Sequence, residues 1–240
     1  MEYGIQLYSV RDMTQNDFEG AVRQVAALGY KSVEPAGFFG RTAEQVNALM
    51  EETGLRISGT HSQLLDLVNK YEETLAFHKA IKNPCYIVPG YSMKNQAEID
   101  GFVNYVNDLA PKLEKEGITL AFHNHAREFI PNADGSVAME QIVCRTNLKL
   151  EVDTYWAFVG MKNPVSFLER VQDRLIAVHM KDGSPDGHGT PLGRGDAPVA
   201  EVYAWVKAHN IPMVVESETC TPDGMTEAKI CIEYLKSLEG

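Results

Sequence analysis

Short apolar, β-branched runs alternate with segments of helical periodicity along the whole chain of 240 residues. The runs predicted as strands cover residues 3–8, 32–34, 57–61, 85–88, 119–123, 148–152, 176–179 and 213–216. Each run is short and alternates poorly between apolar and polar residues. This pattern is typical of parallel strands that pack against helices on one face and a barrel core on the other.

The intervening segments carry helix-end signals. Asp17 is placed to cap the first helix, Gly54 to end the second, and Gly117 to end a helix around residues 102–113. No GxGxxG or GxxxxGK[ST] motif follows the first strand, which removes the usual reason to expect a nucleotide-binding sheet. Eight strand–helix repeats without a linker therefore predict an α/β fold, a (β/α)8 TIM barrel, as a single domain over residues 1–240.

Composition narrows the classes of partner. Lys and Arg number 22 against 33 Asp and Glu, a formal net charge of −11. Nucleic acid and anionic membranes would repel such a surface, whereas a divalent cation suits it. The four cysteines form no CxxC pair, and polar residues interrupt the N-terminal apolar run. We therefore expect reduced thiols, no signal peptide, no membrane span and a cytoplasmic location.

Candidate chemistry lies at the ends of the predicted strands. Six of the eight ends carry a His, Asp or Glu: Glu34, His61, His123 with His125, Asp153, His179 and Glu216. In TIM barrels these carboxyl-terminal strand ends meet around one pocket. Imidazoles and carboxylates suit Mn²⁺, Zn²⁺, Co²⁺ or Fe²⁺. We expect one divalent metal ion, no nucleotide cofactor, and proton transfer beside a carbonyl that the metal polarises.

Further residues near the predicted rim are candidates for substrate contact. Tyr8 and Trp156 offer aromatic faces for a sugar, or barrel packing. Glu34 suits a substrate hydroxyl or the orientation of a metal ligand. Lys181 suits an enolate, a hydroxyl or an ion pair. Arg194 lies in a long glycine-rich loop, residues 182–198, of the kind that often binds ligands. No Lys/Arg cluster suggests a phosphate site, which favours a neutral sugar or keto-sugar.

Seven motifs occur in order along the chain: GIQLYSVR (4–11), GTHS (59–62), LAFHNH (120–125), LEVDT (150–154), VHMKD (178–182), LGRG (192–195) and VVES (214–217). With these motifs the whole chain resembles the sugar phosphate isomerase/epimerase superfamily, the xylose-isomerase-like TIM barrels. The HNH signature at residues 123–125 resembles a branch of that superfamily often described only as sugar isomerase or epimerase.

The resemblance implies a ligand set. Ketose epimerases of the superfamily bind their metal through Glu, Asp, His and Glu from strands five to eight. Asp153, His179 and Glu216 match the last three positions, and His123 stands where those enzymes have glutamate. His125 projects to the same side and is the alternative ligand. Because the epimerases use both glutamates to exchange the substrate proton, the two-carboxylate mechanism does not transfer directly.

The resemblance also implies an activity. We expect a metal-dependent sugar isomerase or epimerase of carbohydrate metabolism, in which Glu216, His61, His125 and Lys181 are catalytic. Glu128 is a further candidate for the second proton-transfer group or for substrate binding. The alternative is a lyase or dehydratase acting on inososes or 3-keto-glycosides. Endonuclease IV is disfavoured because strand four ends without histidine and Trp156 replaces a histidine ligand. Relatives are often dimers or tetramers, so a homo-oligomer is consistent with the resemblance.

Overall fold

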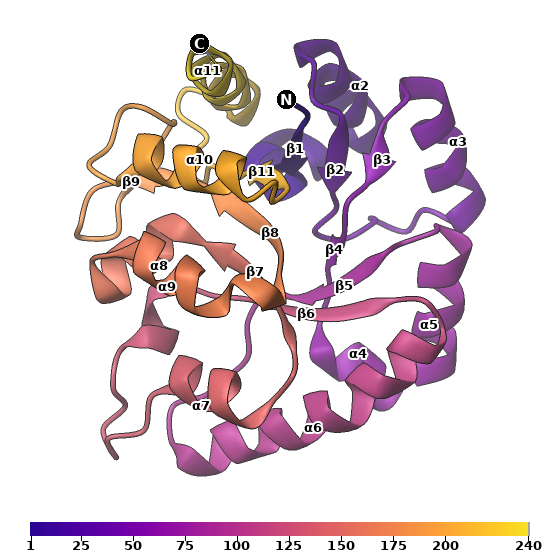
Figure 1. Cartoon of the computed structure of the whole chain (residues 1–240). Coiled ribbons are helices and arrows are strands. Elements are labelled where there is room, and N and C mark those ends of the chain that lie inside the picture. Colours follow the sequence, from indigo (N-terminus) through magenta and orange to yellow (C-terminus); the bar gives the residue numbers. More distant parts are fainter. Residues whose placement is uncertain (240) are drawn as a thin grey trace.

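The structure, a computed structural model that describes residues 1–239, is a parallel β-barrel surrounded by helices (Figure 1). Its strands run in the order β3-β2-β1-β11-β8-β7-β6-β5-β4, and each pair of hydrogen-bonded neighbours in this order is parallel. The strands are β1 Tyr3–Gln6, β2 Ser32–Glu34, β3 Arg56–Ile57, β4 Thr60–His61, β5 Cys85–Val88, β6 Thr119–His123, β7 Lys149–Asp153, β8 Leu175–Met180 and β11 Met213–Val215. The (β/α)8 TIM barrel predicted from the sequence is confirmed.

Two strand predictions differ from the structure by more than one residue at an end. The run at residues 57–61 is not continuous: β3 pairs with β2 and β4 pairs with β5. A Cβ at Gly59, between them, would lie 2.5 Å from Ile87 Cδ1, so the chain there is pressed against β5. The first strand ends at Gln6 rather than Tyr8, because the Gln6 side chain accepts a hydrogen bond from Tyr8 N (3.0 Å) and starts a 3-10 turn.

Helices cover the outside of the barrel (Figure 1). They are α1 Arg11–Thr14, α2 Phe18–Leu28, α3 Ala43–Thr53, α4 Leu64–Asn69, α5 Tyr71–Ala80, α6 Gln96–Lys115, α7 Ala138–Arg145, α8 Thr154–Met161, α9 Pro164–Val171, α10 Val199–Ala208 and α11 Gly224–Ser237. Short 3-10 turns are η1 Leu7–Val10, η2 Ala126–Phe129 and η3 Gln172–Arg174, and β9 Asp182–Gly183 pairs with β10 Gly189–Thr190. Within residues 1–239, no helix has the length and apolar character that a membrane crossing requires.

The helix ends follow the signals in the sequence. Asp17 accepts a hydrogen bond from Gly20 N (2.9 Å) at the start of α2. Gly54 ends α3 with φ +68°, and Gly117 follows α6 with φ +79°, a backbone region that glycine adopts without steric cost. These local signals fix where each helix begins and ends, and therefore which residues remain for the loops at the barrel mouth.

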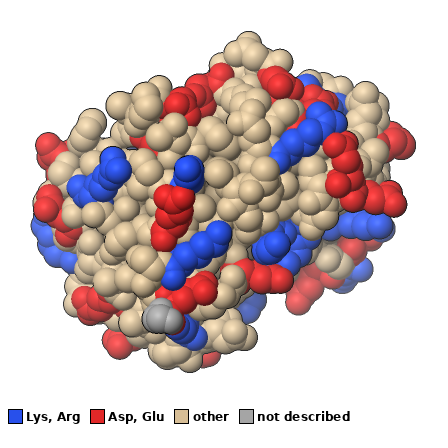
Figure 2. All heavy atoms as spheres, turned by 90° about the horizontal axis from the view of Figure 1, so that it is seen from above, with Lys and Arg blue, Asp and Glu red and all other residues tan. Residues whose placement is uncertain are grey.

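The outer surface carries charges of both signs. In Figure 2, Lys and Arg side chains lie beside Asp and Glu rather than in one basic field. Arg23 and Glu52 (2.6 Å) and Arg170 and Glu140 (2.6 Å) are examples of such neighbours. Exposed pairs of this kind contribute little to stability. The charged groups that can indicate a functional site are therefore the buried ones, which lie inside the barrel.

One buried histidine outside the site gives a test of the fold. His78 of α5 is buried, and Asn83 Nδ2 donates to its Nδ1 (3.0 Å). Burial lowers the pKa of His78 to about 4. An unfolded chain takes up this proton near pH 6.5, so the contribution of His78 to stability is complete above pH 6.5 and is lost between pH 6.5 and 4.

We therefore expect wild-type protein to lose more stability than His78→Gln between pH 7 and pH 4.5. The difference in that loss should be about 2 to 3 kcal/mol, measured by urea unfolding at both pH values. Comparing each protein with itself at the two pH values removes any general effect of the substitution. Equal losses in the two proteins would show that His78 is not held neutral by the fold.

Candidate metal centre and active site

The carboxyl ends of the strands bring acidic and imidazole side chains into the barrel. β7 contributes two of them, because residues two apart in a strand face the same side. Glu151 and Asp153 are each 0% exposed, and His179 from β8 is also 0% exposed. These groups form two clusters at different depths that share His179.

The upper group, called here the rim cluster, consists of His123, Asp153, His179 and Glu216. Each offers one ligand atom, and the four atoms lie within 4.8 Å of one another. His179 Nδ1 lies 3.3 Å from Glu216 Oε2. The geometry thus brings together the ligand set that the sequence suggested, with His123 rather than His125 in the group.

The rim cluster has the properties of a metal site. His123 Nδ1 and Asp153 Oδ2 are buried without a hydrogen-bond partner among the described residues. Burial lowers the pKa of His123 to about 3, so its imidazole is neutral and free to bind a cation. Burial also raises the pKa of Asp153 to about 7. A divalent cation would satisfy the unpaired atoms and stabilise the carboxylate, so these residues fit such an ion.

The lower group, called here the deep cluster, consists of Glu34, His61, Glu151 and His179. His61 Nε2 lies 3.0 Å from Glu34 Oε1 and 2.8 Å from Glu151 Oε2. His179 Nε2 lies 3.0 Å and 3.1 Å from the same two oxygens. Burial opposes a charge on His61, but the two carboxylates outweigh it and raise its pKa to about 9.

Lys181 lies above the clusters. Its Nζ is 2.6 Å from Glu218 Oε1, 3.5 Å from Glu216 Oε2 and 3.8 Å from Asp153 Oδ2. The same atom lies 4.7 Å from the centre of the Trp156 ring. Burial opposes the charge of Lys181, but the carboxylates Glu216 and Asp153 raise its pKa, so it remains an ammonium. The site therefore holds a fixed positive charge.

The barrel mouth opens into a cavity of about 480 Å³, called here the mouth cavity, which is large enough for a sugar. It is lined by Tyr8, Ala36, His61, Gln63, Pro89, His123, His125, Glu216 and Glu218. His125 lies against Trp156, with 5.8 Å between ring centres. Burial lowers the pKa of His125 to about 4, so a neutral imidazole faces the cavity.

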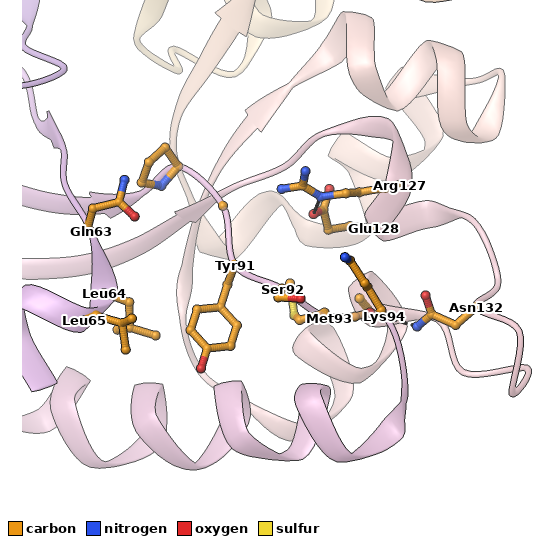
Figure 3. Close-up of a pocket in the computed structure, with 13 residues that line it drawn as sticks. Gln63, Leu64, Leu65, Tyr91, Ser92, Met93, Lys94, Arg127, Glu128 and Asn132 are labelled. Carbon is orange, nitrogen blue, oxygen red and sulfur yellow. Dashed lines mark hydrogen bonds and ion pairs between the residues drawn. The ribbon is translucent and has the colours of Figure 1, made fainter.

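A second cavity of about 720 Å³, the side cavity, adjoins the mouth cavity at Gln63 and Pro89. Figure 3 shows Lys94 and Arg127 on one side of it and Leu64 and Leu65 on the other. Glu128 lines this cavity, and its carboxylate accepts from His125 N (2.7 Å) and Arg127 Nε (2.8 Å). The cations suggested by the sequence for a substrate anion were Lys181 and Arg194. Lys94 and Arg127 are brought to one cavity only by the fold.

The loop after β8 is organised by Asp182. This buried carboxylate accepts hydrogen bonds from the backbone N–H groups of Gly183 (2.8 Å), Gly193 (2.9 Å), Gly195 (2.9 Å) and Ala197 (3.1 Å). Arg194 is exposed on this loop and, within residues 1–239, is not among the residues lining the mouth or side cavity. The loop is thus a folded structure built around one carboxylate.

Asp182→Ala should unfold this loop. Four N–H groups would lose a charged acceptor, and the unfolding free energy should fall by about 3 kcal/mol. Hydrogen exchange should accelerate in residues 183–197, with urea unfolding as the second measurement. Asp186→Ala, which removes an exposed carboxylate from the same loop, is the matched control. Equal effects of the two substitutions would contradict the assigned role of Asp182.

Several residues of the site were not identified from the sequence. Glu151 precedes Asp153 by two positions, and Glu218 follows Glu216 by two. The two-residue period of a strand was the signal that could have found Glu151. Gln63 and Asp182 carried no comparable signal, because their positions depend on loop conformation.

The parallel (β/α)8 barrel with buried imidazoles and carboxylates at its strand ends places this chain among the TIM barrels with a polar centre. The chain belongs to the xylose isomerase-like TIM barrel family, whose model matches residues 22–238. Members of this family and its structural neighbours include enzymes that act on sugar-like substrates.

Curated relatives are distant. An inosose dehydratase from Clostridium botulinum (strain Alaska E43 / Type E3) is 22% identical over 195 residues, which cover 72% of this chain and 65% of the relative. An inosose dehydratase from Clostridium beijerinckii is 20% identical over 191 residues, covering 70% of this chain and 64% of that protein. The match thus spans slightly less than two thirds of the length of these relatives.

Solved structures share the fold along nearly the whole chain. A sugar phosphate isomerase/epimerase from Parabacteroides distasonis has a TM-score of 0.85 at 21% identity, covering 97% of this chain and 96% of that chain. The probable 3-DHS dehydratase of petrobactin synthesis from Bacillus anthracis has a TM-score of 0.78 at 14% identity, covering 98% and 99%. A D-allulose 3-epimerase from Methylomonas sp. has a TM-score of 0.71 at 18% identity, covering 99% and 98%.

Proposed function

We propose that this protein is a divalent-metal-dependent enzyme that removes the proton next to the carbonyl of a sugar or keto-sugar and returns it in an isomerisation or epimerisation. The observation that carries the proposal is the rim cluster, whose four ligand atoms lie within 4.8 Å of one another beside a sugar-sized cavity. His123 and Glu216 belong to the cluster and also line that cavity. A substrate in the mouth cavity would therefore contact the metal ligands directly.

His123, Asp153, His179 and Glu216 would hold the cation. When bound, it supplies Lewis-acid polarisation of the substrate carbonyl. The neutral imidazole of His123 and the unpaired Asp153 Oδ2 support this assignment. The Asp153 side chain also caps α8, because its Oδ1 accepts from Trp156 N (2.7 Å), which fixes the carboxylate in place. The second oxygen is thereby left for the cation.

Glu216 is the proposed proton acceptor. Burial opposes its charge, but Lys181 and His179 hold its pKa well below the usual range, so the carboxylate is ionised and faces the cavity. When it takes the proton from carbon, the electron pair moves to the carbonyl oxygen as an enolate. The Lys181 ammonium, 3.5 Å from Glu216, offsets that new negative charge.

His125 is the proposed second proton-transfer group. It follows β6, and Glu216 follows β11; β7 and β8 separate these strands in the sheet, so the two groups reach the cavity from different sides. Its neutral imidazole can take a proton from carbon, and the imidazolium so formed can return it, where the superfamily's ketose epimerases use a glutamate. His61 also borders the cavity, but Glu34 and Glu151 bind its Nε2. We assign His61 to positioning within the deep cluster.

The other residues proposed from the sequence for substrate contact differ in whether they lie at the mouth cavity. Tyr8 lines the mouth cavity and Trp156 lies against His125 and Lys181, so both suit contact with a sugar ring. Glu34 is 1% exposed beneath the clusters and would orient histidines rather than contact substrate. We leave Glu128 and Arg194 out of the proposed contacts in the mouth cavity, because the first lines the side cavity and the second is exposed.

The proposal is tested by following Mn²⁺-loaded protein with a panel of ketoses, inososes and keto-sugars by ¹H NMR. Formation of an isomer or epimer of at least one substrate, with no loss of water, is the expected result. If every product has lost water or an alcohol, the reaction is an elimination rather than an isomerisation or epimerisation. Absence of turnover for the whole panel would remove the proposal.

Elimination is the second candidate, favoured by the side cavity. It opens beside the mouth cavity and places Lys94 and Arg127 near a group that leaves from the substrate. After the same proton abstraction, the enolate would expel the oxygen on the next carbon, and the carboxyl of Glu216, protonated by that abstraction, would supply the proton that the leaving oxygen needs. The similarity to inosose dehydratases supports this second candidate. Arg127→Ala should then impair release of a bulky alcohol more than release of water.

A further inference from the structure

We propose that Glu34, His61, Glu151 and the Nε2 side of His179 form a second divalent-cation site, below the rim cluster. This site does not depend on the proposed reaction. Its four donor atoms alternate nitrogen and oxygen around a ring, with neighbouring atoms 2.8 to 3.1 Å apart. Metal–ligand bonds of about 2.0–2.2 Å place neighbouring ligands of a tetrahedral site roughly 3.3–3.6 Å apart. These four neighbouring distances would have to lengthen by about 0.2–0.8 Å.

Hydrogen bonds alone satisfy this ring poorly. An imidazole nitrogen carries one hydrogen in one in-plane direction, yet each Nε2 lies within 3.1 Å of two carboxylate oxygens. Glu151 Oε1 is also buried without a hydrogen-bond partner among residues 1–239, as is His123 Nδ1, which lies 3.4 Å from Glu151 Oε2. A cation accepts lone pairs from both imidazole nitrogens and both carboxylate oxygens of the ring at once.

The negative charge of the deep cluster also supports a bound cation. Glu34 and Glu151 are 1% and 0% exposed, so two carboxylates are held away from water. Buried carboxylates require compensating charge. Two protonated imidazoles or one dication can supply it. A dication does so while leaving the lone pair of each imidazole nitrogen free to bind it.

His179 joins the two sites. Its Nδ1 lies 3.3 Å from Glu216 Oε2 in the rim cluster, and its Nε2 lies 3.0 Å from Glu34 Oε1 in the deep cluster. One imidazole can therefore bind a cation on each side. A deep cation would fix the orientation of this ring and reduce its electron donation to the rim site.

Cavities at both ends of the barrel reach the deep cluster. His61 lines the mouth cavity. Glu34 and Glu151 line a separate cavity of about 340 Å³ at the amino ends of the strands, where small residues such as Gly4, Ser32 and Cys85 leave room. A cation that entered from this cavity would not cross the substrate position.

The test is metal-free full-length protein titrated with Co²⁺, followed by visible absorption and by metal analysis. We expect two Co²⁺ per chain in wild type and one in Glu151→Gln, and Glu34→Gln provides a second variant if the first does not fold. Glu227→Gln, which changes a buried carboxylate outside both clusters, should retain two. One Co²⁺ in wild type, unchanged in Glu151→Gln, would overturn the deep site.

Anomalous diffraction from wild-type crystals soaked in Co²⁺ locates the ions without any variant. Peaks at both clusters are the expected result. A peak at the rim cluster alone would overturn the deep site and leave the proposed function intact. A peak at the deep cluster alone would support this inference and contradict the proposed function.

Discussion

Glu216→Gln should reduce turnover by at least about 10³-fold, because the amide cannot accept the proton that the carboxylate takes from carbon. Gln has nearly the same shape as Glu, so the fold should be retained. Since Glu216 is also in the rim cluster, metal content has to be measured on the same sample. Steady-state kinetics at saturating Mn²⁺ is the measurement, with the loss in kcat rather than in KM.

Glu227→Gln is the matched control for this experiment. Glu227 is 0% exposed and accepts a hydrogen bond from Ser217 Oγ (2.6 Å), next to Glu216 in the chain, but it belongs to neither cluster. Its substitution should change kcat by less than about tenfold. A Glu216→Gln enzyme with its metal bound and nearly normal kcat would exclude Glu216 as the proton acceptor.

Asp153→Asn should weaken cation binding at the rim cluster by at least about 100-fold, because even residues that only orient metal ligands often cost 10–100-fold when changed. The fold gives this variant an internal control. Asparagine can cap a helix as aspartate does, so the hydrogen bond to Trp156 N and the start of α8 should persist. Isothermal titration of metal-free protein with Mn²⁺ measures the affinity, and circular dichroism confirms the fold.

Unchanged Mn²⁺ affinity in Asp153→Asn would remove this residue from the ligand set. Loss of affinity together with loss of helix content would instead assign Asp153 a structural role. Because Asp153 Oδ2 is unpaired while Oδ1 caps the helix, we expect the affinity alone to change.

Much of the site was predictable because it depends on periodicity and chain direction. Parallel strands place their carboxyl ends at one face of a barrel, so the strand-end residues from Glu34 to Glu216 could be grouped from the sequence. The resemblance to the superfamily then selected His123, Asp153, His179 and Glu216 from that group. Residues two apart share a face of a strand, so His125 remained an alternative to His123. The structure separates the two: β6 ends at His123, and His125 lies outside the strand at the start of η2.

Depth within the barrel could not be predicted in the same way. It depends on the register between neighbouring strands, and the pairing of β7 with β8 shifts between Leu150 and Glu151. That irregularity sets Asp153 opposite His179 and places Glu151 one layer lower. The contacts of Glu151 with His61 and His179 therefore follow from how the strands pair, which the spacing of residues along the chain does not give.

Loops account for the other differences. The side cavity depends on how the segments after β5 and β6 approach each other, which brings Lys94 close to Arg127 although 33 positions separate them. The order of the loop after β8 depends on one carboxylate, Asp182, that bonds to backbone groups rather than to side chains. Backbone partners leave no signature in the residue types of the loop.

The central claim is that the barrel mouth carries out metal-dependent proton abstraction next to a carbonyl. It is tested most directly by incubating metal-loaded and chelator-treated protein with ketoses, inososes and keto-sugars in D₂O. The account predicts that deuterium from solvent enters the carbon next to the carbonyl of at least one substrate, only with metal present and not with Glu216→Gln. Equal exchange with and without metal, or none with any of these compounds, would contradict it.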